Sequence, residues 1–236
     1  MNNQIIVNNS DTMEILDDFF NDERKRWNNF FENLKVDHPL SSVFPDESLI
    51  DYLDSGKIPI GNVLDIGCGN GRNSVLLAEK GFTVDALDIS DLAIEKTEKL
   101  ARTHKVKVTT HRGNFFNFNK NKKYNLIYDA GMFHHIFPHR RPEYIDSVCE
   151  LLVDGGLLAI IAFNEKMGAS ISDFEIYLNR NMEGGISYPL EKLKSIFEKR
   201  FELLDYREMK NMSPEDRAFG HDFVSVSLWR FNDSKN

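Results

Sequence analysis

The sequence predicts an α/β fold, a doubly wound and mostly parallel β-sheet with helices on both faces. Short apolar runs alternate along the chain with longer segments whose apolar residues recur at helical spacing. Strands that alternate with helices build βαβ units, and such units give parallel sheets. The first apolar run, residues 63–66, leads directly into a glycine-rich turn and then a helical segment. This is the arrangement in which open α/β sheets bind ligands.

The glycine-rich turn contains Gly67, Gly69 and Gly71 at alternate positions. Glycines permit a left-handed backbone and close approach of a ligand, and the first N–H groups of the following helix have no partner within it. A dinucleotide fingerprint would need glycine where Arg72 stands. A P-loop would need lysine and serine or threonine after Gly71, which Arg72 and Asn73 do not supply. The turn therefore predicts a polar ligand other than a pyrophosphate.

Two acids accompany the turn. Asp65 precedes the glycines, and Asp88 ends the next predicted strand, residues 82–87. With these acids the segment resembles the class I S-adenosylmethionine-dependent methyltransferases, whose first motif is an acid followed by G-x-G-x-G. The resemblance implies a Rossmann-like sheet of seven strands with an antiparallel edge strand. It also implies S-adenosyl-L-methionine as cofactor and S-adenosyl-L-homocysteine as product.

In the resembled family the glycine turn meets the amino-acid end of the cofactor, and the acid after the second strand binds the ribose hydroxyls. Asp88 matches that acid, although an aspartate there can also simply cap the helix that begins near Leu92. Asn114 stands where the family usually has an acid for the adenine amino group, and Phe115 is either an adenine contact or a core aromatic. The cofactor contacts implied are Asp65, Gly67, Cys68, Gly69, Asp88, Ile89, Asn114, Phe115, Asp129 and Ala130.

Composition narrows the classes of function. Acidic residues outnumber basic ones by 37 to 29, for a net charge of −8, which disfavours a nucleic-acid partner. The two cysteines, Cys68 and Cys149, fit no metal spacing and suggest a reducing compartment. No apolar run approaches the roughly 18 residues needed to cross a bilayer, and residues 1–4 lack a signal-peptide start. We therefore expect a cytoplasmic protein without membrane partners.

The N-terminal part, residues 1–45, is expected to be a helical extension. Asp11 or Thr12 can cap a helix running to about Leu34, and two prolines follow it. In the resembled family such helices often cover the cofactor, so Trp27 and Phe31 are predicted to be lid and substrate-binding residues. The alternative is an aromatic stripe that only packs on the core.

Residues 46–236 are expected to form the methyltransferase domain. Its first helix covers about residues 46–54. Glycine residues loosen the pattern over residues 164–186, which we interpret as an insertion that acts as a lid over the sheet edge. The remaining expected helices are residues 73–80, 92–102, 142–153 and 187–199, and the remaining expected strands are residues 106–110, 124–129, 157–163, 201–207 and 223–231.

The segment after the fourth strand contains three histidines and two arginines. His134 or His135 could take a proton from an acceptor, because imidazole titrates near neutral pH, or could only form hydrogen bonds. A metal site that includes His139 is disfavoured, because a proline breaks the helical spacing and no carboxylate completes the site. Arg140 and Arg141 could hold a substrate carboxylate or phosphate, or pair with acids such as Glu143 or Asp146.

The same segment distinguishes subclasses of methyltransferase. It lacks the Asn/Asp-Pro-Pro-aromatic motif of DNA amino-methylating enzymes, and the chain lacks the Pro-Cys motif of cytosine C5 enzymes. It looks like the small-molecule branch, including thiopurine-methyltransferase-like and tellurite-resistance-like enzymes. This implies methyl transfer to O, N or S of a small molecule by in-line displacement. The predicted substrate contacts are Trp27, Phe31, His139, Arg140, Arg141 and Tyr188.

Three alternatives stay open on the sequence alone. The chain could act on RNA or protein, which would need a basic or peptide-length groove. It could instead be a non-catalytic module that binds S-adenosylmethionine. Monomer and homodimer are both compatible with the sequence.

Overall fold

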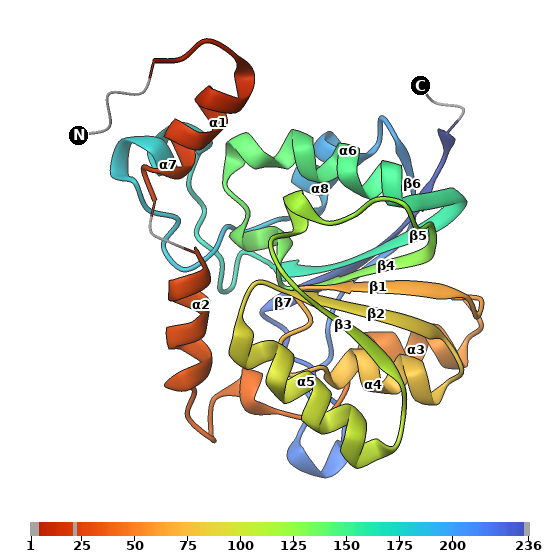
Figure 1. Ribbon diagram of the computed structural model, residues 1–236. Coiled ribbons are helices and arrows are strands. Elements are labelled where there is room, and N and C mark those ends of the chain that lie inside the picture. Colours follow the sequence, from red (N-terminus) through yellow and green to blue (C-terminus); the bar gives the residue numbers. More distant parts are fainter. Residues whose placement is uncertain (1–4, 21–22, 234–236) are drawn as a thin grey trace.

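A mixed seven-stranded sheet with the order β3-β2-β1-β4-β5-β7-β6 lies at the centre of the computed structural model (Figure 1). The structure describes residues 5–20 and 23–233; residues 1–4, which bear on the expected absence of a signal peptide, and residues 21–22 lie outside it. The strands are β1 (Asn62–Ile66), β2 (Thr83–Asp88), β3 (Val108–Arg112), β4 (Tyr124–Ala130), β5 (Leu152–Phe163), β6 (Phe201–Glu208) and β7 (Val224–Phe231).

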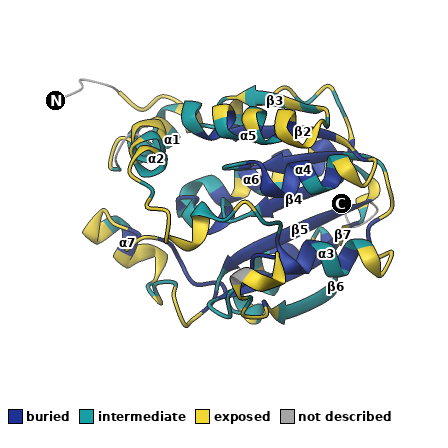
Figure 2. Cartoon of the chain, turned by 90° about the horizontal axis from the view of Figure 1, so that it is seen from below, coloured by how far each residue is buried: buried dark blue, intermediate teal, exposed yellow. Residues whose placement is uncertain are grey.

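Helices cover both faces of this sheet, as the sequence predicts (Figure 1). One face packs against α3 (Glu47–Asp54), α4 (Arg72–Glu79) and α5 (Asp91–His104), and the other against α6 (Arg141–Leu151) and α8 (Leu190–Phe197). Three helices, α1 (Asn9–Asp17), α2 (Glu23–Glu32) and α7 (Asp173–Asn179), lie off the sheet and are largely exposed or half-buried (Figure 2). The segment after β4 forms two short helices, η3 (Phe133–His135) and η4 (Pro138–Arg140).

The order of the strands reverses at β1, which pairs in parallel with β2 on one side and β4 on the other. Val63, Leu64 and Ile66 of β1 are fully buried, because helices cover both faces of a central parallel strand. In open α/β sheets a ligand binds outside the carboxyl ends of the strands at such a reversal. The fold therefore places the candidate site after β1, β2 and β4.

An antiparallel unit completes the sheet, and this confirms the expected antiparallel hairpin at that edge. β7 pairs antiparallel with both β5 and β6, so it lies between them. β5 begins earlier than expected, at Leu152, and includes residues 154–156, which separate the expected helix from the expected strand. The register against β4 shifts between Tyr124 and Leu126, and Gly155 has a positive φ of 71°, so an irregularity replaces a separate turn.

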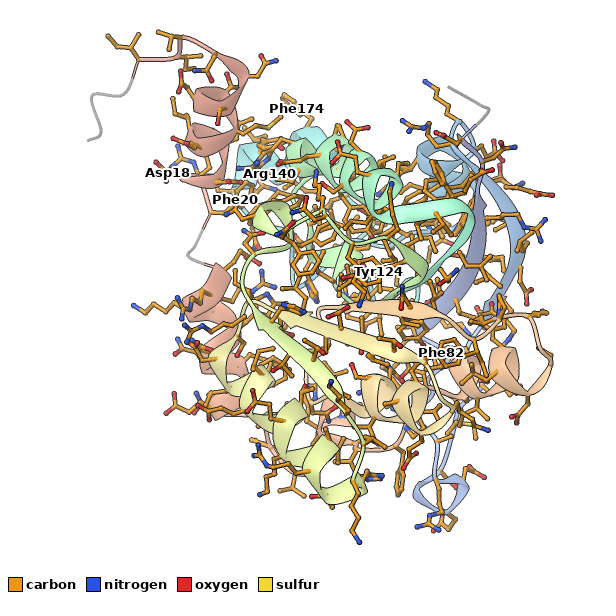
Figure 3. The ribbon with its side chains drawn as sticks, turned by 45° about the vertical axis from the view of Figure 1, so that its right-hand side comes forward. Asp18, Phe20, Phe82, Tyr124, Arg140 and Phe174 are labelled. Atoms are coloured by element: carbon orange, nitrogen blue, oxygen red, sulfur yellow. The ribbon has the colours of Figure 1, made fainter. Side chains whose placement is uncertain are left out.

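The expected single helix from residue 11 to about Leu34 is wrong. Its described part consists of two helices, α1 and α2. Asn8 caps α1 by accepting from the Asp11 N–H at 3.1 Å, and the helix ends at Asp17. Beyond it, the ring of Phe20 stacks on Phe137 with centroids 3.9 Å apart, near Arg140 (Figure 3). The aromatic contact with Phe137, just before η4, replaces the helical continuation that the apolar spacing suggests.

A buried carboxylate fixes the start of α4 against the rest of the domain. Asp46 is fully buried and accepts hydrogen bonds from Arg72 Nε at 3.1 Å and Nη2 at 2.9 Å. Asn73 Nδ2 and the Tyr128 hydroxyl also donate to it, at 3.0 and 2.9 Å. The Arg72 guanidinium lies 3.9 Å from the centroid of the Phe219 ring. Asp46 therefore joins α4, β4 and the segment before α3.

We expect Asp46→Ala to lower the free energy of unfolding by about 3–5 kcal/mol, because it leaves the buried Arg72 charge without its partner. Urea unfolding followed by circular dichroism measures this loss. The control is Asp54→Ala, whose side chain is 64% exposed; this change should stay within about 0.5 kcal/mol of the wild type. Equal losses in the two variants would contradict the anchoring role of Asp46.

Candidate functional site

The glycine turn connects β1 to α4 with three residues in the left-handed region. Gly67, Gly69 and Gly71 have φ of 67°, 57° and 82°. The N–H groups of Gly67 and Cys68 both donate to the Leu87 carbonyl, at 2.8 and 3.1 Å, which ties the turn to β2. A Cβ at position 71 would lie 2.7 Å from Thr97 Oγ1, so glycine is required there by both conformation and space.

Asp88, the last residue of β2, faces this turn. Its Oδ2 accepts from the Gly69 N–H at 2.9 Å, and its Oδ1 accepts from the Ser90 N–H at 2.8 Å. The side chain is 7% exposed, and burial raises the pKa of its carboxyl to about 6. The alternative role of capping the next helix belongs to Ser90, whose Oγ accepts from the Ala93 N–H.

Across the edge, η3 presents two histidines. The buried His134 ring stacks on Phe163 with centroids 3.9 Å apart, and its Nδ1 accepts from the Phe163 N–H at 3.3 Å. His135 is half-buried, with its ring centroid 4.2 Å from that of His134. Burial lowers the pKa of His134 to about 3 and that of His135 well below its ordinary value, with the Arg26 charge adding to both shifts.

Helix α2 spans the distance between these two parts of the edge. Trp27 packs edge-on against His135, with ring centroids 4.9 Å apart. One helical turn later, the Phe31 ring lies 3.6 Å from where a Cβ of Gly69 would be. Asn28 Oδ1 accepts from Ser90 Oγ at 2.7 Å, which fixes α2 on the loop after β2. The helix therefore covers the edge from the histidines to the glycine turn.

Comparison with known sequences identifies the family. Residues 63–156 match the profile of a family described as a methyltransferase domain. An uncharacterized methyltransferase, C750.03c, from Schizosaccharomyces pombe is 31% identical over 117 residues, which are 49% of this chain and 80% of that protein. The chain belongs to the class I S-adenosylmethionine-dependent methyltransferase family.

Two further methyltransferases are also similar. Thiocyanate methyltransferase 1 from Brassica oleracea is 35% identical over 116 residues, 48% of this chain and 51% of that protein. A 2-heptyl-1-hydroxyquinolin-4(1H)-one methyltransferase from Mycobacteroides abscessus is 27% identical over 136 residues, 57% of this chain and 60% of that protein. The match thus spans little more than half the length of these two relatives.

Solved structures of methyltransferases share the fold. Magnesium protoporphyrin IX methyltransferase from Synechocystis PCC 6803, with bound S-adenosylhomocysteine, superposes with a TM-score of 0.63 at 16% identity and covers 93% of this chain and 99% of that one. N-methyltransferase NodS from Bradyrhizobium japonicum WM9, in complex with S-adenosyl-L-homocysteine, gives 0.57 at 17% identity, covering 78% and 84%. S-adenosylmethionine is the cofactor of this methyltransferase family.

The residues at the edge fit this cofactor. The Asp88 carboxylate retains lone pairs beyond its two backbone bonds, and a carboxylate suits a sugar diol. Gly69 has a positive φ and no side chain, and a Cβ there would point toward α2 and narrow the space over the turn. These two residues can therefore hold the ribose and accommodate the amino-acid end of the cofactor.

The other predicted cofactor residues of this methyltransferase lie around the same edge, in different environments. Asp65 is buried with Oδ2 2.5 Å from Ser74 Oγ, and burial raises the pKa of its carboxyl to about 7. Asp129 accepts from the Met132 and Phe133 N–H groups and from the Tyr144 hydroxyl. Asp129 therefore shapes the loop after β4, whereas Asp65 joins β1 to α4. Cys68 and Phe115 are buried, Ile89 and Ala130 are half-buried, and Asn114 is exposed with its Oδ1 accepting from the Phe116 N–H.

The structure separates the two arginines predicted to bind substrate. Arg140 is paired with Glu143, as the alternative held, and also with Asp17 of α1 through Nε and Nη2, at 3.2 and 2.5 Å. His139 is engaged too, with Nε2 2.7 Å from Asp17 Oδ1 and Nδ1 2.7 Å from the Tyr177 hydroxyl. Arg141 Nη1 donates to Asp173 at 2.8 and 2.9 Å, and its other two nitrogens have no hydrogen-bond partner among the described residues.

Sequence reasoning missed Glu23 and Arg26 of α2. Arg26 Nη1 donates to Glu23 Oε1 at 2.9 Å, and its Nη2 lies 3.4 Å from His135 Nδ1. Burial raises the pKa of the Glu23 carboxyl, although the neighbouring Arg26 charge acts to lower it. Their position on the same helical face as Trp27 is a signal that the sequence offers. Within the described ranges, no three or more His, Cys, Asp or Glu side chains gather in a way that could hold a metal ion.

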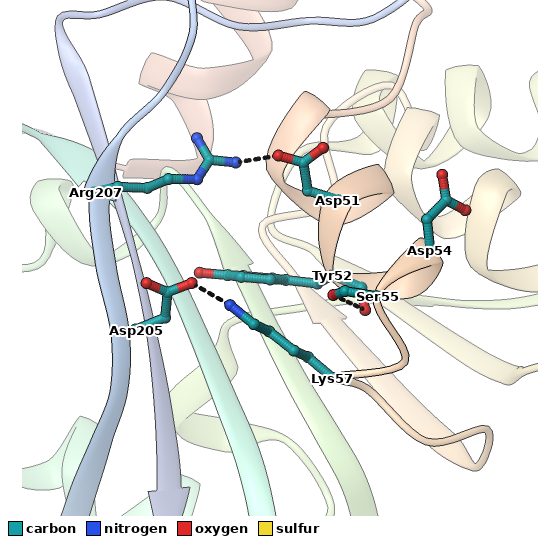
Figure 4. Close-up of a pocket in the computed structure, with 7 residues that line it drawn as sticks. All are labelled: Asp51, Tyr52, Asp54, Ser55, Lys57, Asp205 and Arg207. Atoms are coloured by element: carbon teal, nitrogen blue, oxygen red, sulfur yellow. Dashed lines mark hydrogen bonds and ion pairs between the residues drawn. The ribbon is translucent and has the colours of Figure 1, made fainter.

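Two cavities lie away from the glycine turn. One of about 410 Å³ opens between α3 and β6, where Lys57 pairs with Asp205 and Arg207 pairs with Asp51 (Figure 4). The other, about 880 Å³, lies beside β2 and β3, where Asp85 is satisfied by Lys122 and Tyr124. The charged groups that line both cavities are paired. Neither cavity is therefore a better candidate for the cofactor site than the strand ends.

We expect Asp88→Asn to weaken S-adenosylhomocysteine binding about 10- to 100-fold at pH 8, because a charged acceptor contributes about 1.5–3 kcal/mol per hydrogen bond. The wild-type affinity should fall as the pH is lowered through about 6, where the carboxyl gains a proton, and the variant should lose this dependence. Isothermal titration calorimetry at several pH values measures both effects. Asp85→Asn, on the same strand but the opposite face, is the control.

We expect Trp27→Ala to weaken S-adenosylhomocysteine binding at least fivefold without changing the unfolding midpoint, because α2 covers the edge but adds no residue to the buried core. Fluorescence or calorimetric titration measures the affinity. Asn29→Ala, on the exposed side of the same helix, should bind like the wild type. Equal affinities for Trp27→Ala and Asn29→Ala would contradict the covering role.

Proposed function

We propose that this protein transfers the methyl group of S-adenosylmethionine to a small molecule by in-line displacement. The observation that supports this most is the single edge at which the glycine turn, Asp88 and the two histidines meet under α2. Bound S-adenosylmethionine supplies a methyl group already activated by its sulfonium. The chain's own residues hold the reactants in line and exclude water, and Trp27 and Phe31 of α2 serve the second task.

The environment of the histidines favours an acceptor that needs little help in losing a proton. His134 is buried against Phe163, and His135 lies beside the Arg26 guanidinium, which disfavours a second positive charge. Their hydrogen bonds in the described residues are with the Phe163 amide and Arg26, and no carboxylate orients either ring. Both rings are therefore neutral, weak bases that position the acceptor rather than remove its proton.

An acceptor that arrives as an anion, or that has an acidic proton, matches this environment. The Arg26 guanidinium beside His135 can attract such an acceptor to the edge. The relatives support this class by name, since thiocyanate is an anion and an N-hydroxyquinolone has a more acidic hydroxyl than an alcohol. We infer that the acceptor atom is a thiolate, a small anion or an acidic hydroxyl.

The remaining functional assignments are proposals that follow from this one. Residues 1–45 and residues 164–186 serve as lids over the methyltransferase domain, since α1 and α7 both contact η4 through Asp17 and Tyr177. The two cysteines are free, which suits a reducing cytoplasm. In the described part of the chain, no helix has both the length and the apolar composition that a bilayer crossing needs. The net charge of −8 weighs against an RNA acceptor.

Incubation of the purified protein with S-adenosylmethionine and an acceptor panel tests the proposal. S-adenosylhomocysteine should form with thiocyanate, a small thiol or an N-hydroxyquinolone, and more slowly with alkyl alcohols and amines. Asp88→Ala should remove this activity. Tight cofactor binding with no product from any acceptor would instead favour a non-catalytic binding module.

Once an acceptor is known, we expect His135→Ala to lower kcat less than tenfold, because His135 only positions the acceptor. Loss of a general base would instead lower kcat about 10²- to 10⁴-fold. At saturating S-adenosylmethionine, where the effect of pH on cofactor affinity does not enter, the wild-type kcat should also show no ionisation near the ordinary histidine pKa of about 6.5. Steady-state kinetics between pH 5.5 and pH 8.5 measure both. A loss of more than 100-fold, with a pH profile that depends on His135, would assign proton removal to this residue.

A further inference from the structure

Two neighbouring arginines, Arg140 and Arg141, begin α6 and have different surroundings. The Nε and Nη2 edge of Arg140 is filled by the Asp17 carboxylate. The same edge of Arg141 is buried, and neither nitrogen has a hydrogen-bond partner among the described residues. Arg141 as a whole is 8% exposed. An unpaired buried N–H is destabilising, and more so in a charged group, so this edge requires a partner.

A second unpaired group faces the first. Tyr188 is fully buried, and its hydroxyl has no hydrogen-bond partner among the described residues. Arg141 Cζ lies 5.5 Å from the centroid of the Tyr188 ring. The Arg141 side chain is close enough to the Tyr188 hydroxyl to oppose the rise in pKa that burial causes, but the two groups do not form a hydrogen bond of good geometry. Two N–H groups side by side and one nearby O–H form a donor set without an acceptor.

Charges of both signs surround this donor set. Lys192 Nζ lies 4.9 Å from the centroid of the same Tyr188 ring, and burial together with the Arg141 charge lowers the pKa of Lys192. Asp173 is the carboxylate that pairs directly with Arg141, and its side chain is 50% exposed. Asp129 acts on Tyr188 from farther away, since it is bonded to Tyr144.

The backbone contributes a positive field at this point. Arg141 is the first residue of α6, and Tyr188 lies just before α8; neither helix has a side-chain cap at its N-terminus. Helix N-termini favour negative charge. The edge formed by Nε and Nη2 is also the edge through which arginine binds a carboxylate or phosphate with two parallel hydrogen bonds, as Asp17 does on Arg140.

We propose that Arg141 and Tyr188 form an oxyanion-binding site, which takes a carboxylate or phosphate group between the Arg141 Nε–Nη2 edge and the Tyr188 hydroxyl. The site goes beyond the proposed methyl transfer and does not depend on it. Asp173 occupies the remaining nitrogen of Arg141 and holds the guanidinium in place. Because Asp173 begins α7, the site joins the insertion at residues 164–186 to the start of α6.

Calorimetric titration of the intact protein with sodium phosphate and with sodium acetate tests the site. The wild type should bind at least one of them, and the stronger probe distinguishes phosphate from carboxylate as the preferred group. Arg141→Lys keeps the charge but lacks the two-nitrogen edge, and should weaken binding at least tenfold. Tyr188→Phe removes only the hydroxyl and should weaken binding about three- to tenfold.

Arg140→Lys is the matched control, because the corresponding edge of Arg140 is already occupied, and it should bind the probe like the wild type. Binding of neither probe by the wild type, or equal weakening by Arg140→Lys, would overturn the site and leave ordered water as the partner of these donors. Titration with S-adenosylhomocysteine separates the two proposals. Unchanged affinity in Tyr188→Phe would show that the fold and the cofactor site are intact, whereas failure of the wild type to bind it would count only against the methyltransferase proposal.

Discussion

The buried pair between Asp46 and Arg72 is the constraint on which the ligand-binding edge depends. Arg72 starts α4 directly after the glycine turn. Asp46 pairs with it in the interior of the protein and also accepts a hydrogen bond from the Tyr128 hydroxyl of β4. Charges this deeply buried are tolerated only when they are paired and hydrogen-bonded. The pair therefore fixes the turn relative to β4 and to the segment before α3. It also explains why arginine follows the last glycine of the turn.

Negative charge collects at the carboxyl ends of three adjacent strands. Asp65, Asp88 and Asp129 end or nearly end β1, β2 and β4, and burial raises the pKa of each, to about 7, 6 and 6. None of the three has an ion pair in the described residues. An edge of this kind favours a cationic ligand such as a sulfonium, whose charge relieves the cost of burying the carboxylates. The neutral histidines opposite add no competing cation.

Local patterns in the sequence predicted the fold well where strands are buried on both faces. β1, β2 and β4 and the turn after β1 followed from apolar runs and glycines, and Asp88 lies where its motif placed it. The separation of α1 from α2 could not be predicted, because apolar spacing continues through Phe20 and only its contact with Phe137 decides the break. The partners of Arg140 and Arg141 depend on α1 and α7, which are remote in sequence.

The order of the strands also determines how this sheet meets other molecules. β3 and β6 are its two outermost strands, and both expose backbone groups on one side. β3 includes His111 and Arg112, while β6 contains Glu202 and Asp205 among its charged residues. Charged side chains on outer strands resist the addition of a further strand from another chain. Self-association by continuation of the sheet is therefore disfavoured at both margins, and any contact between copies would have to use the helical layers.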